Sequence, residues 1–261
     1  AAGCLSTAFV WLQHHSAVRA VSASTDAGLR AAWLRPMCAG QRRAGLALAG
    51  AMPGPSLLRA EVAPGGYVFE GTSPWVTGWG HIDTLYVAAR DDQDNVVWGL
   101  IDASPGSALA FERLDMVAVM ASQTVKATFR QCFVPAERIV RKMPIKEWRI
   151  RDAGGLRSNG SLALGVAARC CALLGPSPLD AEIGAARDRL DAGTPQTMPA
   201  ARAVASELAL RAATALLVAS GSASILASSQ AQRLAREALF LLVFASRPAI
   251  KESLSGLLAS R

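Results

Sequence analysis

The sequence predicts an α+β multidomain protein in three parts: a short N-terminal helical segment (1–43), a central antiparallel β sandwich or barrel (44–140) and a C-terminal helical bundle (152–261). Apolar residues recur at helical spacing in the first part, whereas short apolar runs alternate with turn residues in the second. In the third part, capping residues and Gly-Pro breaks divide the chain into helices. Because no helical pattern separates the central strands, we expect an antiparallel rather than a parallel sheet.

The N-terminal part is predicted to form two helices. Leu5, Phe9 and Leu12 lie at helical spacing, and the segment 24–26 (Ser-Thr-Asp) can cap a second helix that runs to about Cys38. The adjacent residues His14 and His15 face different sides of the first helix, so at most one of them could serve a site. We expect an ordinary histidine at the boundary of the core.

The central part is predicted to contain six short strands. Turn residues, such as Ala-Pro-Gly-Gly at 63–66 and Asp-Asp-Gln-Asp-Asn at 91–95, separate them. The expected strands are 57–62, 67–77, 83–90, 96–101, 108–114 and 124–134.

The C-terminal part is predicted to contain four helices. The first begins at Asn159 or Ser161 and ends near Leu174, where Gly-Pro-Ser-Pro stops it. The others span about 179–191, a long stretch from Thr197, and a last helix from Gln230. Pro248 should end or kink that last helix, because proline removes a backbone donor. Glu207 and Arg211 are spaced to pair across one helical turn.

The charge pattern favours a small anionic ligand over nucleic acid. The net charge is +7, but no run of five basic residues occurs and the arginines are dispersed. Five cysteines without a CxxC pair indicate reduced thiols and a cytoplasmic protein. Three histidines and these cysteines form no recognisable metal-binding spacing, so no metal is expected.

One charge-free stretch, 212–232, is long enough to raise the question of a membrane span. Six serine or threonine residues and two glutamines interrupt it, which is more polar than a spanning helix tolerates. We therefore predict a buried helix of a water-soluble bundle and no membrane span.

Several segments, in order, resemble the acyl-CoA dehydrogenase family over about residues 5–250. The segment 66–78 reads GYVFEGTSPWVTG and resembles the family pattern G-x-Y-x-x-x-G-x-K-x-W-I-T-N. Residues 125–140 resemble the family's exit from its β domain, through F-x-x-x-x-V-P. In the helical part, 162–167, 189–193 and 232–238 are similar to A-L-G-x-A, R-x-x-F-G and R-x-x-R-D-A. Most of the family's N-terminal helical domain has no counterpart in the chain.

The resemblance implies FAD as the cofactor. Trp75, Val76 and Thr77 stand at the W-I-T position, where the tryptophan forms a wall for the flavin ring and the threonine donates a hydrogen bond. Two residues apart on one strand, Trp75 and Thr77 should share a face. Ser56 stands in the position of the flavin-binding loop (50–57), in which Pro53 also matches the family but its threonine, glutamate and aspartate do not.

Arg189 matches an arginine that the family places against the cofactor pyrophosphate of a neighbouring subunit. The resemblance therefore implies a homo- or hetero-oligomer.

The catalytic carboxylate of the family is missing. The family's base is a glutamate that removes a proton α to the thioester carbonyl. Its position after R-D-A falls at Ala245, and the alternative position ahead of A-L-G falls at Gly155 or Leu156; none is acidic. The nearest carboxylates in the sequence are Asp152, Glu147 and Glu252, the last useful only if its helix ran on past Pro248.

Three functions stay open. The first is an FAD-dependent acyl-CoA dehydrogenase with an electron-transfer acceptor protein as its partner. The second is a catalytically inactive family member that serves as a partner subunit of a hetero-oligomer. The third is a flavin-dependent monooxygenase on the same fold, whose chemistry needs no such carboxylate.

Overall fold

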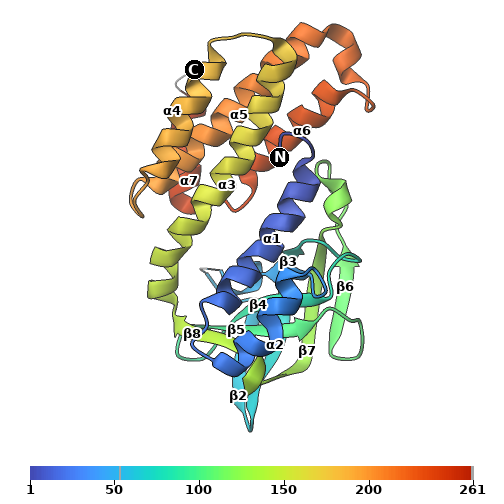
Figure 1. Ribbon diagram of the computed structural model, residues 1–261, viewed down its shortest axis with the longest axis vertical. Coiled ribbons are helices and arrows are strands. Elements are labelled where there is room, and N and C mark those ends of the chain that lie inside the picture. The colour runs from blue at the N-terminus through green and yellow to red at the C-terminus, as the bar shows by residue number, and fades with distance from the viewer. Residues whose placement is uncertain (53, 260–261) are drawn as a thin grey trace. The chain divides into compact units, whose positions relative to one another are not determined.

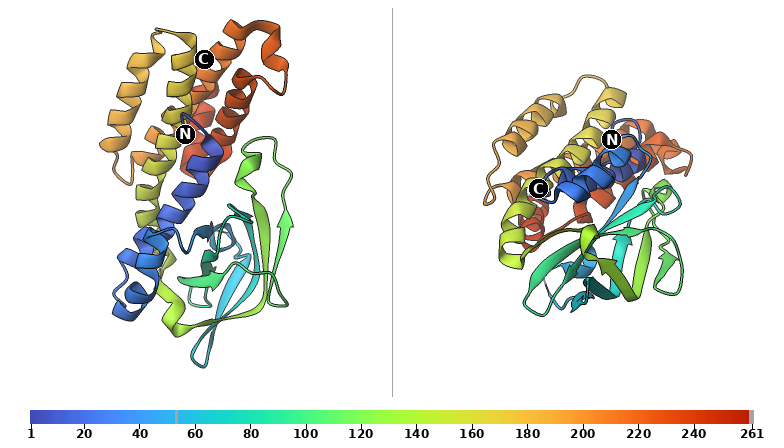
Figure 2. Two further views of the ribbon diagram at one scale, coloured as in Figure 1. Left: turned by 45° about the vertical axis from the view of Figure 1, so that its right-hand side comes forward. Right: turned by 60° about the horizontal axis from the view of Figure 1, so that its bottom comes forward.

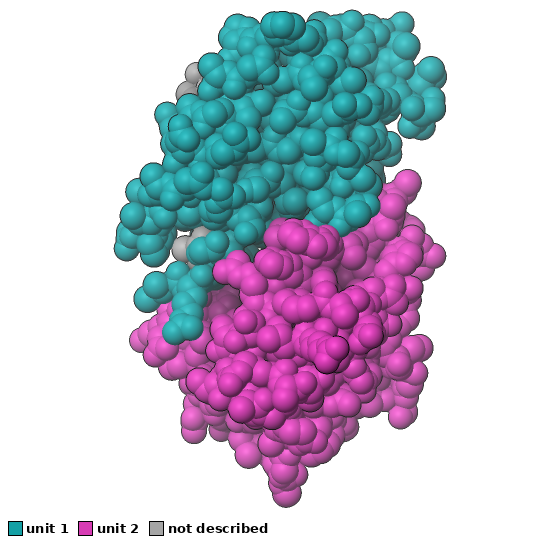
Figure 3. Space-filling model, viewed as in Figure 1, with its two compact units in different colours: residues 1–9, 117–119, 149–261 teal, residues 10–116, 120–148 magenta. Residues whose placement is uncertain are grey.

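The computed structural model describes residues 1–52 and 54–259, apart from the side chain of residue 153. Two compact units divide the chain (Figure 3). Unit 1 comprises residues 1–9, 117–119 and 149–261, and unit 2 comprises 10–116 and 120–148. The division into domains 1–43, 44–140 and 152–261 stays a prediction.

Unit 2 is built on one mostly antiparallel sheet, as predicted (Figure 1). Its strands are β1 (Ala44–Ala47), β2 (Leu58–Ala63), β3 (Gly66–Val76), β4 (Thr84–Arg90), β5 (Asn95–Asp102), β6 (Leu109–Arg113), β7 (Val125–Pro135) and β8 (Ile139–Pro144). Their order is β6-β7-β3-β2-β4-β5-β8, and β1 pairs with β4 in parallel. All six predicted strands form, with ends that agree within one residue.

The strands that sequence patterns missed are β1 and β8. The four residues of β1 show no alternation of apolar and polar side chains. Its partner strand, β4, follows about 40 positions later in the chain, with Ala44 beside Thr84. Strand β8 holds Arg141 and Lys142, so its composition did not mark it as an apolar strand. Both are fixed by tertiary pairing rather than by local sequence.

The central strands are buried on both faces. Leu85, Val87 and Ala89 of β4 join one apolar cluster, whereas Tyr86 and Ala88 join a second. The first cluster lies inside the curled sheet, where Gly99 of β5 closely approaches Val134 of β7. A Cβ at position 99 would lie 2.9 Å from a Val134 methyl carbon, so glycine allows the sheet to close on itself.

The second cluster is covered by two helices, α1 (Leu5–Ser22) and α2 (Ala27–Cys38). Both helices were predicted. Asp26 caps α2, because its carboxylate accepts a hydrogen bond of 2.9 Å from the Leu29 N–H. Trp33 and Met37 of α2 pack with Tyr86 and Trp98 of the sheet. This packing fixes the segment that leads into β1.

Unit 1 is a bundle of helices: α3 (Ile145–Leu174, of which 149–174 belong to this unit), α4 (Leu179–Asp191), α5 (Met198–Ser220), α6 (Gln230–Val243) and α7 (Pro248–Ala259). Helices α3, α4 and α5 run side by side (Figure 2). The prediction of 179–191 is confirmed to the residue, and Arg211 pairs with Glu207 at 2.7 Å as expected.

Two helix boundaries were predicted wrongly. Helix α3 begins at Ile145, well before Asn159, and continues through Gly154, Gly155 and Gly160. Buried apolar residues at both ends of the helix outweigh the weak helix propensity of these glycines. Pro248 neither ends nor kinks a helix, because α6 already ends at Val243 and Pro248 begins α7. The first turn of a helix tolerates proline, whose missing N–H would have no partner there.

The charge-free stretch 212–232 is not one buried helix. It spans the end of α5, a 3₁₀ turn (Gly221–Ile225) and the start of α6, and Val218 and Ile225 are exposed. By length and composition alone, Met198–Ile225 is apolar enough to cross a membrane. A core helix passes the same test, and α5 packs against α4, α6 and α7.

Candidate functional site

The end of β3 does not place Trp75 and Thr77 on one face, contrary to the prediction. Trp75 is 60% exposed, whereas Thr77 is 1% exposed and lies just past the last strand residue, Val76, which is fully buried. The register of β3 against β7 shifts between Ser73 and Val76, and Trp75 adopts a left-handed φ of +64°. This bulge breaks the alternation of the strand and turns the indole outward.

The predicted flavin-binding loop does lie against β3. The Gly50 N–H donates to Ser73 Oγ at 3.3 Å, and the Thr72 N–H donates to the Leu57 carbonyl at 2.7 Å. A Cβ at Gly50 would lie 2.5 Å from the Thr72 carbonyl, so only glycine permits this approach. The loop therefore lies beside the residues that precede Trp75. Pro53 lies outside the described residues.

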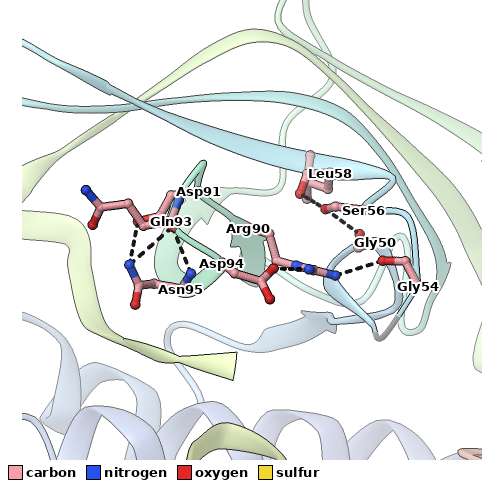
Figure 4. Close-up of polar contacts among 9 residues, drawn as sticks. All are labelled: Gly50, Gly54, Ser56, Leu58, Arg90, Asp91, Gln93, Asp94 and Asn95. Carbon is pink, nitrogen blue, oxygen red and sulfur yellow. Dashed lines mark hydrogen bonds and ion pairs between the residues drawn. The ribbon is translucent and has the colours of Figure 1, made fainter. Parts of the chain in front are cut away.

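The Ser56 hydroxyl is used within its own loop. It donates to the Leu58 carbonyl at 2.7 Å and lies 3.3 Å from the Gly50 carbonyl (Figure 4). A hydroxyl has one proton, so Ser56 could donate to a phosphate only by releasing these carbonyls. Ser56 acts first as a loop residue, and its role toward a cofactor stays a prediction.

A pocket of about 260 Å³ lies beside this loop, lined by Gly54, Pro55, Ser56, Arg59, Arg90, Asp91, Asp92 and Asp94. Arg90 donates to the Gly54 carbonyl at 2.8 Å and pairs with Asp94 (Figure 4). Arg59 lies opposite Arg90 where β2 runs parallel to β4. Sequence reasoning missed both arginines, because no local pattern shows that β2 and β4 are neighbours.

The walls of this pocket are held by Asp91, whose carboxylate organises the turn after β4. It accepts hydrogen bonds from the Gln93 and Asn95 N–H groups at 3.0 and 2.8 Å (Figure 4). It also pairs with Lys142 at 2.6 Å. Burial alone would raise the pKa of Asp91, but the hydrogen bonds from Lys142 and Asn95 stabilise the ionised carboxylate more strongly. The pKa of Asp91 is therefore lowered. The carboxylate is therefore ionised and committed to the turn.

Three buried hydroxyls lie next to the end of β3. The Oγ1 atoms of Thr77 and Thr124 are 3.4 Å apart, and Ser122 Oγ lies 2.9 Å from Thr124 Oγ1. The three residues are 0–5% exposed. Sequence reasoning singled out Thr77 alone, since Ser122 and Thr124 lie 45 and 47 positions away along the chain.

In unit 1, the expected positions of the base lie near one carboxylate. Ala245 occupies the turn between α6 and α7 with a left-handed φ of +50°. Two residues on, Arg247 pairs with Asp152 of α3 at 2.8 Å, and both side chains are 19% exposed. Asp152 is therefore near the turn, but it already has a cationic partner.

The other positions considered for the base, of which Glu147 and Glu252 are acidic, are less suited to that role. On α3, Gly155 is exposed and Leu156 is buried, while Glu147 is exposed and belongs to unit 2. Glu252 is exposed on α7, a helix separate from α6. Among the described residues, no group of three His, Cys, Asp or Glu side chains could hold a metal.

One buried carboxylate of unit 1, that of Glu237, was not singled out from the sequence. Glu237 is 4% exposed and pairs with Arg233 at 2.7 Å, and burial raises its pKa.

Arg189, the predicted pyrophosphate ligand, is exposed near the end of α4. Its role stays a prediction.

Comparison with known proteins agrees with this architecture. No family model matches the chain. The chain is 30% identical over 88 residues to the mitochondrial isovaleryl-CoA dehydrogenase of Arabidopsis thaliana, a match that covers 32% of this chain and 22% of that protein. The matched region thus spans about a fifth of the curated relative's length.

Solved structures match almost the whole chain. The structure of butyryl-CoA dehydrogenase from Megasphaera elsdenii matches with a TM-score of 0.81 at 17% identity. The match covers 99% of this chain and 79% of the butyryl-CoA dehydrogenase chain. A glutaryl-CoA dehydrogenase in complex with glutaryl-CoA matches with a TM-score of 0.82 at 16% identity, and the match covers 100% of this chain and 77% of that chain. The chain therefore has the acyl-CoA dehydrogenase fold, as the resemblance predicted, and over 88 residues its sequence is similar to that of an acyl-CoA dehydrogenase.

Proposed function

We propose that the protein is an FAD-dependent enzyme of the acyl-CoA dehydrogenase class, which introduces an α,β double bond into an acyl-CoA thioester. The observation that carries the proposal is the exposed indole of Trp75, held at the end of β3 in a fold shared with acyl-CoA dehydrogenases. When bound, FAD would supply the hydride acceptor for this reaction.

The residues at the end of β3 suit such a cofactor. The indole of Trp75 offers a flat apolar surface against which an isoalloxazine ring can stack. Thr77, which the resemblance assigns as a hydrogen-bond donor, is buried, and Arg59 lines the pocket beside the 50–57 loop, in which Arg90 is paired with Asp94. A guanidinium group binds phosphate in a two-pronged geometry, so Arg59 suits a phosphate of FAD or of CoA.

The proposal is tested by titrating the purified protein with FAD and following the quenching of flavin fluorescence. We expect saturable binding that Trp75→Leu weakens about tenfold or more, the scale of one aromatic stacking contact. Trp11→Leu is the matched control, because Trp11 is 61% exposed on α1 and should leave FAD binding unchanged. A wild-type protein without affinity for FAD contradicts the proposal.

A second candidate function is a catalytically inactive partner subunit. The specific observation in its favour is that Ala245 cannot accept a proton and that Asp152 is already paired with Arg247. Anaerobic addition of acyl-CoA thioesters separates the two functions. Bleaching of the bound flavin supports the dehydrogenase, whereas bleaching that appears only with Ala245→Glu supports the inactive subunit.

The proposal extends to partners and location. An electron-transfer protein would reoxidise the flavin, and the chain would act in the cytoplasm as part of a homo- or hetero-oligomer.

The flavin monooxygenase alternative predicts a different result, namely consumption of O₂ with a hydroxylated product. Detection of an enoyl-CoA product without oxygen excludes that alternative.

A further inference from the structure

The 50–57 loop, described except for residue 53, is held at both of its ends. The Gly50 N–H donates to Ser73 Oγ at 3.3 Å, and the Thr72 N–H donates to the Leu57 carbonyl at 2.7 Å. The Leu57 N–H closes the loop, because it donates to the Gly50 carbonyl at 2.9 Å. These bonds fix where the loop leaves and rejoins the sheet, but they do not fix the position of its apex.

The apex of the loop is held by Arg90 of β4. Its Nη1 donates to the Gly54 carbonyl at 2.8 Å, and its Nη2 pairs with Asp94 (Figure 4). A guanidinium presents its donors in one fixed plane, so Arg90 can bind the carbonyl and the carboxylate at the same time. Among the described residues, no other side chain from outside the loop donates a hydrogen bond to residues 54–56.

The turn to which Arg90 ties the loop is itself anchored. The Asp91 carboxylate accepts hydrogen bonds from the N–H groups of Gln93 and Asn95. Asp94 adopts a left-handed φ of +62°, and its carbonyl accepts a hydrogen bond of 3.1 Å from the Ile145 N–H. The loop apex therefore takes its position from this turn, through Arg90.

The pocket beside the loop leaves one of its two arginines for a ligand. Both Nη groups of Arg90 are in use, whereas Arg59 is exposed and forms no ion pair with the described residues. Two of the three carboxylates that line the pocket are neutralised, because Asp91 pairs with Lys142 and Asp94 pairs with Arg90. Arg59 is therefore the cation that can meet a phosphate group.

We infer that Arg90 is a positioning residue, which holds the loop apex at Gly54 so that the pocket is formed before a phosphate group reaches Arg59. The inference rests on the proposed function, in which that phosphate belongs to FAD or to CoA. A loop that is ordered in advance spares the entropy that binding would otherwise lose. Loss of Arg90 should therefore weaken binding through the loop, and loss of Arg59 through the direct contact.

The first part of the test is hydrogen exchange of the ligand-free protein, with Arg90→Met compared with Arg59→Met. Both substitutions keep a long side chain and remove the charge. The amides of Leu57 and Thr72 report on the loop, since both are hydrogen-bonded at its ends. We expect Arg90→Met to speed their exchange about tenfold or more, the effect of losing one charged hydrogen bond. Arg59→Met should leave their exchange unchanged.

The second part is titration with FAD, followed by fluorescence, and with CoA, followed by calorimetry, which distinguishes the two sources of phosphate. For the ligand that binds, we expect each variant to weaken binding about tenfold. Arg130→Met is the matched control, because Arg130 is an exposed arginine of β7. It should change neither the exchange of the loop amides nor the affinity.

Two results overturn the inference and leave the proposed function intact. One is wild-type exchange of the loop amides in Arg90→Met, and the other is faster exchange in that variant without any loss of affinity. A wild-type protein that binds neither FAD nor CoA overturns both. If Arg90→Met does not fold, Asp94→Asn decides, because asparagine tolerates the left-handed φ but lacks the charge that fixes Arg90. Wild-type exchange in Asp94→Asn also overturns the inference.

Discussion

Among the described residues of unit 1, the guanidinium of Arg202 is the most deeply buried charge. It is 1% exposed, and burial lowers its pKa to about 10. It donates to the Leu241 carbonyl at 2.8 Å, at the end of α6, while Nε and Nη1 have no hydrogen-bond partner among the described residues. The Leu241 carbonyl also accepts a hydrogen bond from Ser206 at 3.0 Å. The cation stays charged at neutral pH, so its desolvation cost is fully present there.

Two substitutions of Arg202 should distinguish the energetic cost of its buried charge from the contribution of the volume that its side chain fills. Arg202→Met removes the buried charge and fills the space, and Ser206 still satisfies the Leu241 carbonyl. We expect its free energy of unfolding to stay within about 1 kcal/mol of wild type or to rise. Arg202→Ala leaves a cavity and should cost about 3 kcal/mol. Urea denaturation measures both. Equal losses in the two variants would show that the hydrogen bonds to α6 outweigh the buried charge.

His14 links α1 to the segments that follow it. Its Nδ1 accepts a hydrogen bond of 3.0 Å from the Ala44 N–H, and its Nε2 lies 3.2 Å from the Met37 carbonyl. The ring can satisfy both partners only when neutral, with the proton on Nε2. Burial, aided by repulsion from His15 and opposed by the Met37 carbonyl, lowers the pKa of His14. This agrees with the expectation of an ordinary histidine at the edge of the core.

This arrangement predicts an acid-sensitive stability. Because the folded pKa is below the unfolded value of about 6.5, the unfolded state binds the proton more readily. The contribution of His14 is complete above about pH 6.5 and declines as the pH falls below it. We expect His14→Gln to cost about 1 kcal/mol at pH 7.5 and to flatten the acid slope of urea denaturation. The control His81→Gln, at an exposed position, should keep the wild-type slope.

At the level of elements, the glycines of α3 serve different purposes. A Cβ at Gly160 would lie 2.6 Å from a methyl carbon of Leu190, which is buried in α4, so glycine allows the two helices to approach. A Cβ at Gly154 would meet no atom within 4 Å. The helix was predicted to begin at Asn159 or Ser161, but it runs through these glycines, although glycine is a poor helix former. Only the contact between α3 and α4 explains why one of these glycines is needed.

Two alanine substitutions test this distinction. Gly154→Ala should raise the free energy of unfolding by about 0.5–1 kcal/mol, since alanine restricts the unfolded chain. Gly160→Ala should lower it by about 1–3 kcal/mol, because the added methyl crowds Leu190. Thermal unfolding of both variants provides the measurement. Stabilisation by Gly160→Ala would show that α3 and α4 can move apart at little cost.

Across the whole molecule, local sequence predicted the elements better than their partners. The six central strands and α4 follow from apolar runs and turn residues. The outward turn of Trp75 could not be predicted, because it depends on a bulge formed against β7. The pocket of Arg59 and Arg90 depends on the parallel contact of β2 with β4. The pairing of Asp152 with Arg247 joins residues 95 positions apart, a separation that no local pattern reveals.

The exposed Arg189 predicts an assembly. If it binds the cofactor pyrophosphate of a neighbouring subunit, the protein should have at least twice the mass of one chain in solution. Arg189→Gln should weaken FAD binding about tenfold, because a charged hydrogen bond is lost. Light scattering and FAD titration measure the two effects. The control Arg187→Gln, also exposed on α4, should bind FAD normally. A monomer that binds FAD with full affinity contradicts this role.

The parallel pairing of β1 with β4 has a consequence for the order of folding. Only a few residues separate the paired strands of the hairpins β2–β3 and β4–β5. Strand β1, by contrast, pairs with β4, which follows about 40 positions later in the chain. Distant contacts form late because closing a long loop costs entropy. The described residues between β1 and β2, 48–52 and 54–57, should therefore become ordered after the hairpins. Pulsed hydrogen exchange should show the amides of β1 gaining protection after those of β4 and β5.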